Sequence, residues 1–391
     1  SDGRNSQGMQ IQLEHGDTPL LTCSSRAADV ASVVADLAAA VGTMELAGAL
    51  LFCSNRFPRD ELAKALREGL PGVPLIGCTS AGELTDRGYD TETVVLVGFP
   101  AESFSMVSLR FDALDHFDPQ EAQGAIRQLV AGARLDHAAV QDVHQVALFF
   151  VDGLSHREEL LTMTAQHALG DIQLIGGSSG DGLSFSETGV LHEGRFHGDC
   201  AVIAVLTSRR PMHVFCESPY RPGPARMVIT EADPQTRTVY EINAAPAAEE
   251  YVRLTGQTPD ALDAHFFAAH PLMVRTGGQY HVRSIQSANP DGSLTFYCAI
   301  DTGVVLTIGE PIERIAWMNE LIGKVSQRIG TIDHVIGFDC VLNRLDAEDR
   351  QIVRELSRLY VDNKIIGFNT YGEQFLAAHM NQTFSGLAIG R

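Results

Sequence analysis

The sequence predicts an α/β fold, with repeated strand–helix–strand–hairpin units in its N-terminal half and a mixed, antiparallel α/β C-terminal half. Two observations predict it. Short apolar runs alternate with segments whose apolar residues have a helical period. In addition, the polar turn "LIGCTSAGEL" (75–84) recurs as "LIGGSSGDGL" (174–183) and, more loosely, as "IIGFNTYGEQ" (365–374). Each copy closes a longer unit of the same order.

In the first unit, "GALLFCS" is an apolar run too short for a helix and predicts a strand. The segment "PRDELAKALREGL" follows, with Leu62, Leu66 and Leu70 on one helical face. "VPLIG", the turn and "TVVLVGF" then predict a second strand and a hairpin that leads into a third strand. A strand–helix–strand step implies a right-handed parallel crossover.

Two further units repeat this order. The second contains "QVALFFV", "SHREELLTMTAQHAL", "IQLIG", the turn and "CAVIAVL", and its Ser155 and Glu158 have the spacing of a capping box. The third contains "HVIGFDCVL", "DAEDRQIVRELSRLY", "KIIG", the turn and "FSGLAIG". Repetition on this scale indicates that the turn belongs to the architecture, since a catalytic nucleophile would be needed only once. We expect the third unit to pack beside one of the first two.

A different segment separates the second and third units. "PYRPGPARM" (219–227), with three prolines and a glycine, marks a boundary. After it, "ANPDGS" lies between two alternating segments and predicts an antiparallel hairpin. We therefore predict a first region at 27–218 and a second at 219–391. Residues 1–26 are predicted to be a vector-derived remnant and an N-terminal lead-in, because they lack the apolar core of a signal peptide.

The composition argues against several classes of function. A net charge of −20 without a basic run disfavours binding to nucleic acid or anionic lipid. No window approaches 18 uninterrupted apolar residues, so no membrane span is predicted. The seven cysteines are scattered and form no C-x-x-C pair, which argues against a disulfide framework or structural zinc. We therefore predict a cytoplasmic location.

Four segments carry a resemblance to a known family. In this order, "LIGCTSAGEL", "YEINAAPAAEEYV", "YHVRSIQSANPDGSLTFYCAIDTGVVLTIGEP" and "GFNTYGEQF" resemble the FIST sensory proteins, from about Ala27 onward. The resemblance implies FIST N and FIST C regions in tandem. It also implies an intracellular signal-input module that binds a small ligand and works with a histidine kinase or a cyclic-dinucleotide enzyme. Some stand-alone members resemble haem-binding nitric-oxide sensors, so haem b is an implied cofactor. Ala244 departs from the family pattern, which usually shows glycine there.

The recurring turn is open to three interpretations. Residues 176–180 satisfy G-x-S-x-G, so a serine-dependent hydrolase using Ser178 is an alternative to a non-enzymatic sensor. A nucleophile elbow needs a helix after the serine, however, and the following segment predicts a hairpin. A phosphate cradle is disfavoured because neither a Walker lysine nor G-x-G-x-x-G is present. For the chain as a whole, a ligand-free signalling scaffold is a further alternative.

The third interpretation is a ligand pocket. Loops of successive crossover units gather at the carboxyl ends of parallel strands, where open α/β sheets bind ligands. We predict a pocket between the two regions, with these ligand-binding residues on its rim: Thr79, Ser80, Ser178, Ser179, Asn369, Thr370 and Glu373. Arg283 or a nearby histidine is predicted opposite. Arg283 would serve either as an anchor for a carboxylate or haem propionate or in an ion pair with a nearby acid. The alternative is that each turn side chain bonds to local backbone.

Three histidines are candidate ligands for the haem that the resemblance implies. His281 interrupts an apolar strand, His270 precedes a proline beside "LMV", and His197 lies in a predicted hairpin. There is no C-x-x-C-H, so haem would be held non-covalently and would need one axial ligand and an apolar pocket. Each of these histidines also fits an ordinary hydrogen-bonded role.

Overall fold

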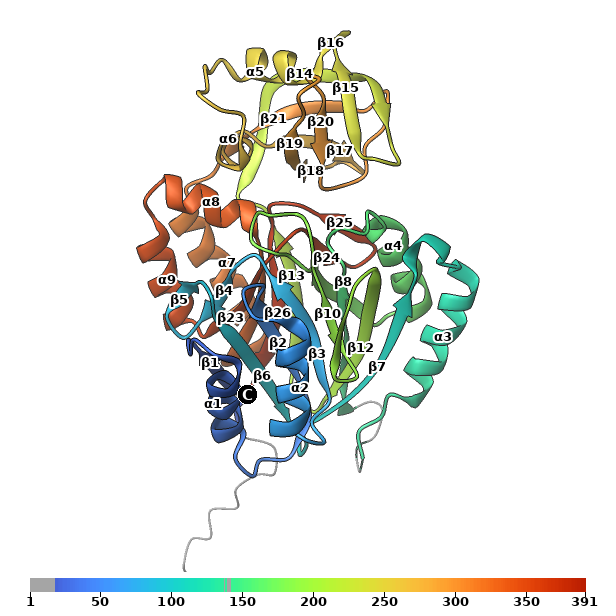
Figure 1. The fold of residues 1–391 in the computed structure, drawn as a ribbon, viewed down its shortest axis with the longest axis vertical. Helices are drawn as coiled ribbons and strands as arrows, with labels where there is room; N and C mark the ends of the chain where they lie inside the picture. Colours follow the sequence, from blue (N-terminus) through green and yellow to red (C-terminus); the bar gives the residue numbers. More distant parts are fainter. Residues whose placement is uncertain (1–17, 137, 139–141) are drawn as a thin grey trace, which may run out of the picture.

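A computed structural model describes residues 18–136, 138 and 142–391. Of the predicted remnant and lead-in at 1–26, residues 1–17 therefore lie outside the described residues. The chain folds into a large body of three units, called the ring here, and a smaller part at one end of it, called the cap (Figure 1). The prediction of a mixed α/β fold is confirmed. No helix in the described part of the chain combines the length and apolar character needed to cross a membrane.

The first unit contains the elements that its sequence predicts, preceded by one more strand and helix. Its elements are β1 (Leu21–Ser25), α1 (Val30–Val41), β2 (Leu46–Ser54), α2 (Arg59–Gly69), β3 (Leu75–Ser80), β4 (Glu83–Thr85), β5 (Gly88–Asp90) and β6 (Val94–Pro100). Strands β2 and β3 are parallel, as the crossover rule predicts, and β6 lies antiparallel to β2.

The second unit repeats this order. Its elements are β7 (Phe104–Asp112), the short 3-10 helix η1 (Leu114–His116), α3 (Pro119–Gly132), β8 (His144–Val151), α4 (Glu158–Leu169), β9 (Gln173–Ser178), β10 (Val190–His192), β11 (Arg195–His197) and β12 (Cys200–Ser208). Strands β8 and β9 are again parallel, and β12 lies between β8 and β7.

The third unit is interrupted by the cap after its first strand. Its elements are β13 (Met212–Glu217), α7 (Arg314–Ile329), β22 (Ile332–Cys340), α8 (Val341–Asp349), α9 (Val353–Asp362), β23 (Ile365–Thr370), β24 (Glu373–Phe375), β25 (Ala378–Met380) and β26 (Phe384–Gly390). The expectation that this unit packs beside the earlier ones is confirmed, because it shares sheets with both.

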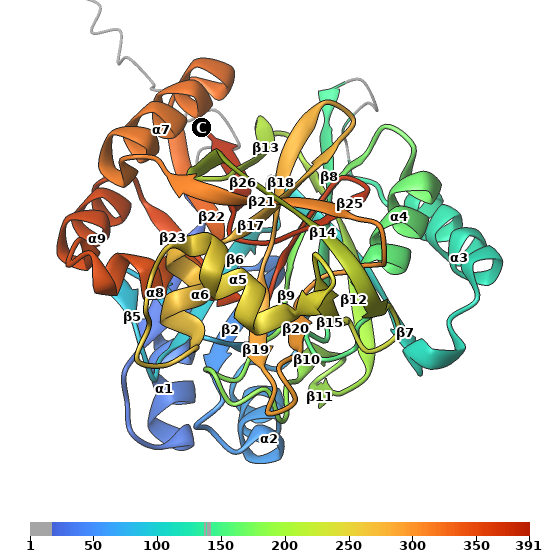
Figure 2. The same ribbon diagram turned by 90° about the horizontal axis from the view of Figure 1, so that it is seen from above.

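The hairpin of each unit pairs with a strand of another unit. Hairpin β4–β5 pairs with β23 of the third unit, β10–β11 pairs with β3 of the first, and β24–β25 pairs with β9 of the second. The exchange is cyclic, so the three sheets close into a ring. Seen from the cap end, the helices of the three units lie around the outside and the strands face inward (Figure 2).

The centre of the ring is an aromatic core with one contribution from each unit. Phe52, Phe150 and Phe338 occupy equivalent places on β2, β8 and β22, and their ring centroids lie 5.7, 6.0 and 6.3 Å apart. Phe368 of β23 stacks on Phe52 with a centroid distance of 4.5 Å. Aromatic contacts at these distances add to the free energy of apolar burial. The inward faces of all three sheets therefore share one core.

The repeated glycine of the turn motif has a steric cause. Gly77, Gly176 and Gly367 stand at the same place in the parallel pairs of the three units. An added Cβ would lie only 1.8, 1.7 and 1.8 Å, respectively, from a carbonyl oxygen of the facing strand. A side chain at any of these positions would push the two strands apart, so the glycine in each copy is required by strand packing.

The cap is an antiparallel sheet with two helices. Its elements are β14 (Tyr220–Asp233), β15 (Thr238–Ile242), β16 (Ala245–Pro246), α5 (Ala247–Thr255), α6 (Ala264–Ala269), β17 (Leu272–Thr276), β18 (Gln279–Arg283), β19 (Ile285–Ala288), β20 (Leu294–Phe296) and β21 (Val305–Pro311). The chain leaves the ring at the segment 219–227 and returns after β21, so two adjacent strands, β14 and β21, connect the cap to the ring.

Candidate functional site

The three turns meet at the end of the ring that faces the cap. The Ala81 N–H donates to the Asn369 carbonyl at 2.9 Å, and the Gly180 N–H donates to the Thr79 carbonyl at 3.0 Å. Turns of the second and third units are joined in the same way. The structure thus brings the predicted turn residues together, as the rule for carboxyl strand ends implies.

The side chains of these turns are enclosed. All seven turn residues predicted to bind ligand are at most 2% exposed. Thr370 Oγ1 donates to the Glu373 carboxylate at 2.5 Å, and the N–H and hydroxyl of Thr383 donate to its other oxygen at 2.9 and 2.6 Å. Ser80, Glu83 and Thr93 form the same arrangement in the first unit. The turn residues line neither of the two large cavities described below, and their contact with a ligand stays a prediction.

Glu373 is a carboxyl group held away from water. Burial raises its pKa to about 8, against the opposing effect of the Thr370 and Thr383 hydrogen bonds. Burial likewise raises the pKa of Glu83. Because desolvation disfavours the charged form, Glu373 binds a proton in the folded protein at pH values where an unfolded glutamate is ionised.

This proton makes stability depend on pH. Between the unfolded pKa of about 4.3 and the folded value of about 8, the folded state binds the extra proton, so stability falls as pH rises. We expect Glu373→Gln, which resembles the protonated form, to lack this part of the decline. Relative to wild type, it should gain roughly 3 kcal/mol between pH 5 and 8 in urea unfolding. Glu249→Gln, on the exposed face of α5, is the control. The prediction is contradicted if stability depends on pH in the same way for wild type, Glu373→Gln and Glu249→Gln.

The predicted nucleophile has no catalytic surroundings. The Ser178 hydroxyl is fully buried and accepts a hydrogen bond of 2.9 Å from Gln374 Nε2. Among the described residues, no histidine nitrogen lies in hydrogen-bond contact with Ser178, and β9 leads through a loop to β10 rather than into a helix. The strand-to-helix elbow that a serine hydrolase needs is therefore not formed here.

A buried ion pair joins the ring to the cap. Arg237 of the cap, 2% exposed, donates from Nη2 to Glu158 of α4 at 2.8 Å and to Glu159 at 2.5 Å. Glu159 also accepts from the Ala299 N–H at 2.7 Å. The predicted capping box is wrong: α4 begins at Glu158, after Arg157 rather than after Ser155, and Glu158 pairs with the cap instead of capping the helix. Sequence reasoning missed Arg237, since it stands in a polar turn.

Polar atoms without a protein partner lie beside this junction. Gln374 Nε2 lies 3.0 Å from His379 Nδ1, so the neutral ring carries its hydrogen on Nε2. Burial lowers the pKa of His379. Within the described residues, His379 Nε2, Gln374 Oε1 and the Tyr297 hydroxyl are buried and have no hydrogen-bond partner. Buried polar atoms are almost always paired, so these mark a place where the packed arrangement is not fully satisfied.

Arg283 and the candidate haem ligands are dispersed over the cap and the β10–β11 hairpin. Arg283 and His281 are half-buried on β18, and burial lowers the pKa of His281. His270 follows α6, with its ring 4.4 Å from that of Phe266, and His197 Nε2 lies 3.1 Å from the His192 carbonyl. In the part of the chain that the structure describes, no three His, Cys, Asp or Glu side chains gather as a metal site.

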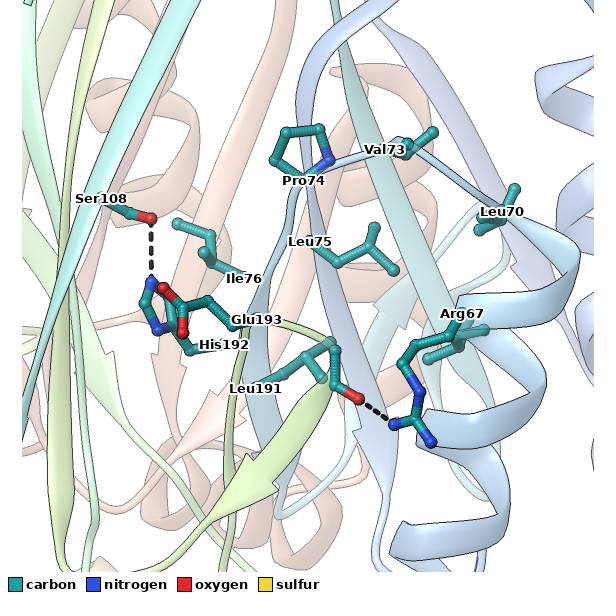
Figure 3. A pocket seen from close by; sticks show the side chains of 13 residues that line it. Arg67, Leu70, Val73, Pro74, Leu75, Ile76, Ser108, Leu191, His192 and Glu193 are labelled. Carbon is teal, nitrogen blue, oxygen red and sulfur yellow. Dashed lines mark hydrogen bonds between the residues drawn. The ribbon is translucent and has the colours of Figure 1, made fainter.

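A cavity lies at a seam between two units of the ring (Figure 3). Its volume is about 420 Å³. The end of α2 and the start of β3 form one wall, and β7 and the β10–β11 hairpin of the second unit form the other. The lining is mostly apolar and comprises Leu66, Arg67, Leu70, Gly72, Val73, Pro74, Leu75, Ile76, Ser108, Leu191, His192, Glu193 and Gly194.

His192 is the buried polar group of this cavity. Its Nδ1 lies 2.9 Å from Arg110 Nη1, and its Nε2 lies 2.9 Å from Ser108 Oγ. A guanidinium group can only donate, so Nδ1 accepts and Nε2 carries the hydrogen that is donated to Ser108. Burial lowers the pKa of His192, which favours this neutral form. Both ring nitrogens are thus occupied. The role of His192 depends on contacts with Ser108 and Arg110, which lie 84 and 82 residues away in the sequence.

The hairpin at the cavity is continuous with a loop that touches the cap. Residues 180–189 precede β10, and the Asp181 carboxylate accepts three backbone N–H bonds of 2.8–2.9 Å from residues 185–187. The Phe185 ring in this loop lies 5.7 Å from that of Tyr297 in the cap and 4.8 Å from that of Tyr371. The loop that leads into the hairpin therefore contacts both the cap and the turn of the third unit.

The described part of the chain is thus a ring of three strand–helix–strand units that carries an antiparallel cap. The FIST N domain model matches residues 47–245 and the FIST C domain model matches residues 247–376. The chain belongs to the FIST family, whose domains are associated with sensing in signal transduction. No curated protein matches the chain. The two family regions meet inside the cap, at β16 and α5.

Proposed function

We propose that this protein is a non-enzymatic sensor that binds a small molecule in the cavity of Figure 3 and passes the signal to its cap. One observation carries the proposal. The cavity is walled by two units, and the β10–β11 hairpin in its wall follows residues 180–189, a loop that packs on the cap. A ligand that touches both walls stabilises the arrangement in which both contacts form.

The lining indicates the ligand class. Pockets of about 300–1,000 Å³ hold small molecules, and walls built from leucine, isoleucine, valine and proline side chains favour an apolar body. Ser108, Glu193 and Arg67 offer a few polar contacts at the edge. The ligand is therefore a compact, mainly apolar molecule with few polar groups.

Transmission would use the junction between cap and ring. The Arg237 ion pair holds the cap in one position, while the unpaired atoms of His379, Gln374 and Tyr297 leave that position incompletely satisfied. An element with two arrangements of similar free energy can be shifted by a modest difference in ligand affinity. The output would be read by a separate partner in the cytoplasm, of the kinds implied by the resemblance: a histidine kinase or a cyclic-dinucleotide enzyme.

Retention of a natural ligand tests this proposal. We expect protein purified from its producing cells to release, on denaturation, a small molecule at near-stoichiometric amount, detected by mass spectrometry. Val73→Trp fills the edge of the cavity and should lose the compound, because the indole occupies its volume. Val361 is an exposed residue of α9, and Val361→Trp is the matched control that should retain the compound.

Two results would contradict the proposal. Equal retention by Val73→Trp and wild type would place the ligand elsewhere, and no retained compound would favour the ligand-free scaffold. The exchange of backbone hydrogens at residues 180–189 and in the cap provides a second measurement. Both segments should gain protection when the compound is added back to the empty protein.

Haem, and nitric oxide through it, are the specific ligands implied by the family resemblance. The residues do not fit haem in this conformation: His281, His270 and His197 line neither large cavity, and His192 uses both ring nitrogens. The absorption spectrum of the same purified samples tests whether the protein binds haem. A stoichiometric Soret band that disappears on replacing one of these histidines would establish haem as the ligand and displace the apolar metabolite proposed here.

A further inference from the structure

The outer face of the cap sheet carries a second cavity with a different chemistry. It has a volume of about 410 Å³ and lies over β14, β21 and β17, with β18 beside them. Its floor includes Met273, Val305 and Tyr280. The opposite face of these strands packs on the core of the cap and includes Met227 and Leu306, both 1% exposed. The cavity is therefore on the face opposite the core of the cap.

The strand register explains which side chains share this face. Arg226 of β14 faces Thr307 of β21, which faces Met273 of β17. In the neighbouring row, Val228 faces Val305, and Arg275 of β17 faces Tyr280 of β18. Residues that face each other across a ladder point to the same side of a sheet. Arg226 and Arg275 thus stand on two strands separated by β21 and are offset by two residues along the strands, which places their backbones about 12 Å apart.

The apolar part of this face is open. Val305 is 51% exposed and Val228 is 38% exposed, which is unusual for valines that lie side by side in a sheet. Both arginines are exposed, and neither forms an ion pair with any described residue. In a chain with a net charge of −20, two unpaired guanidinium groups beside an apolar floor form a local site of opposite sign.

We infer that this face of the cap binds an amphipathic anion: a small molecule with a carboxylate, sulfonate or phosphate group on an apolar body. The anionic group would lie above β21, where Arg226 and Arg275 reach it from either side. Guanidinium groups pair with such oxyanions through directed hydrogen bonds. The apolar body would cover Val305 and Tyr280 and remove their exposed surface from water. This site is separate from the cavity of Figure 3 and does not depend on the function proposed for it.

Two fluorescent probes of nearly the same shape test the inference. One is 8-anilinonaphthalene-1-sulfonate, and the other is its uncharged relative N-phenyl-1-naphthylamine. We expect the wild-type protein to bind the sulfonate, and the double variant Arg226→Gln/Arg275→Gln to bind it at least about tenfold more weakly. The affinity for the uncharged probe should change by less than about twofold, because the apolar floor is retained.

Control variants separate this site from others. Arg221→Gln removes an exposed arginine of the same strand that pairs with Glu310 outside the cavity, and it should leave the sulfonate affinity unchanged. Val73→Trp should also leave it unchanged. The inference is wrong if the wild type does not bind the sulfonate, if the double variant binds it like wild type, or if Val73→Trp abolishes binding. An equal loss of both probes in the double variant would also overturn it, because it would indicate a disturbed sheet.

Discussion

Replacement of Gly176 by alanine should destabilise the protein by about 3 kcal/mol, measured as the free energy of unfolding in urea. The added Cβ would lie 1.7 Å from the Phe149 carbonyl oxygen of the neighbouring strand. That oxygen belongs to a fully buried backbone and cannot turn aside as a flexible side chain would. The strands β8 and β9 must therefore separate, with a cost at the upper end of that for overpacked cores.

A glycine in the same unit provides the control. Gly198 is exposed, and an added Cβ there would meet no atom within 4 Å. Gly198→Ala should change the free energy of unfolding by less than about 1 kcal/mol. Gly77→Ala and Gly367→Ala should resemble Gly176→Ala, because their contacts of 1.8 Å are of the same kind. Stability of all three variants within 1 kcal/mol of wild type would show that the steric account is wrong.

Replacement of Arg237 by methionine should loosen the cap from the ring at a cost of about 3–5 kcal/mol. The substitution leaves Glu158, which is 1% exposed, as a buried carboxylate without its counter-ion. We expect faster backbone hydrogen exchange near residues 237–242 and in the first turn of α4, together with a lower unfolding midpoint. Arg237→Met/Glu158→Gln should recover part of the loss, because it removes the stranded charge as well.

An exposed pair serves as the matched control for this experiment. Arg221 and Glu310 lie 3.5 Å apart with side chains 66% and 50% exposed. Arg221→Met should cost less than about 1 kcal/mol, as is usual for ion pairs in water. If Arg237→Met were equally mild and left hydrogen exchange unchanged, the junction would not be held by this ion pair.

Local patterns predicted the units of the ring well. The apolar runs became the central strands, and the leucines of α2 face the core as their spacing implied. The hairpins were also predicted, but not their exchange, because a short strand carries no local sign of which distant strand it will pair with. The contact between Phe52, Phe150 and Phe338 depends on that exchange, so local sequence patterns do not predict it either.

The candidate site was predicted in part. The convergence of the turns followed from the topology of parallel strands, whereas the enclosure of their side chains follows from contacts between units. The spacing of Ser80 with Glu83 and of Thr370 with Glu373 could have indicated internal hydrogen bonds. His192 and Arg237 acquire their roles from neighbours far along the chain, Ser108 and Glu158, and single-sequence reasoning has no access to such pairs.

The cyclic exchange of hairpins has a consequence for the way this chain is made. A ribosome releases β4–β5 when only the first unit exists, and its acceptor strand β23 is among the last segments to emerge. The first unit must therefore wait with an unpaired hairpin and with β3 open for β10–β11. During that interval, nascent chains on neighbouring ribosomes offer the same acceptors, so intermolecular pairing competes with ring closure. Crowded translation should thus favour entangled dimers, and slow, dilute synthesis should favour the closed monomer.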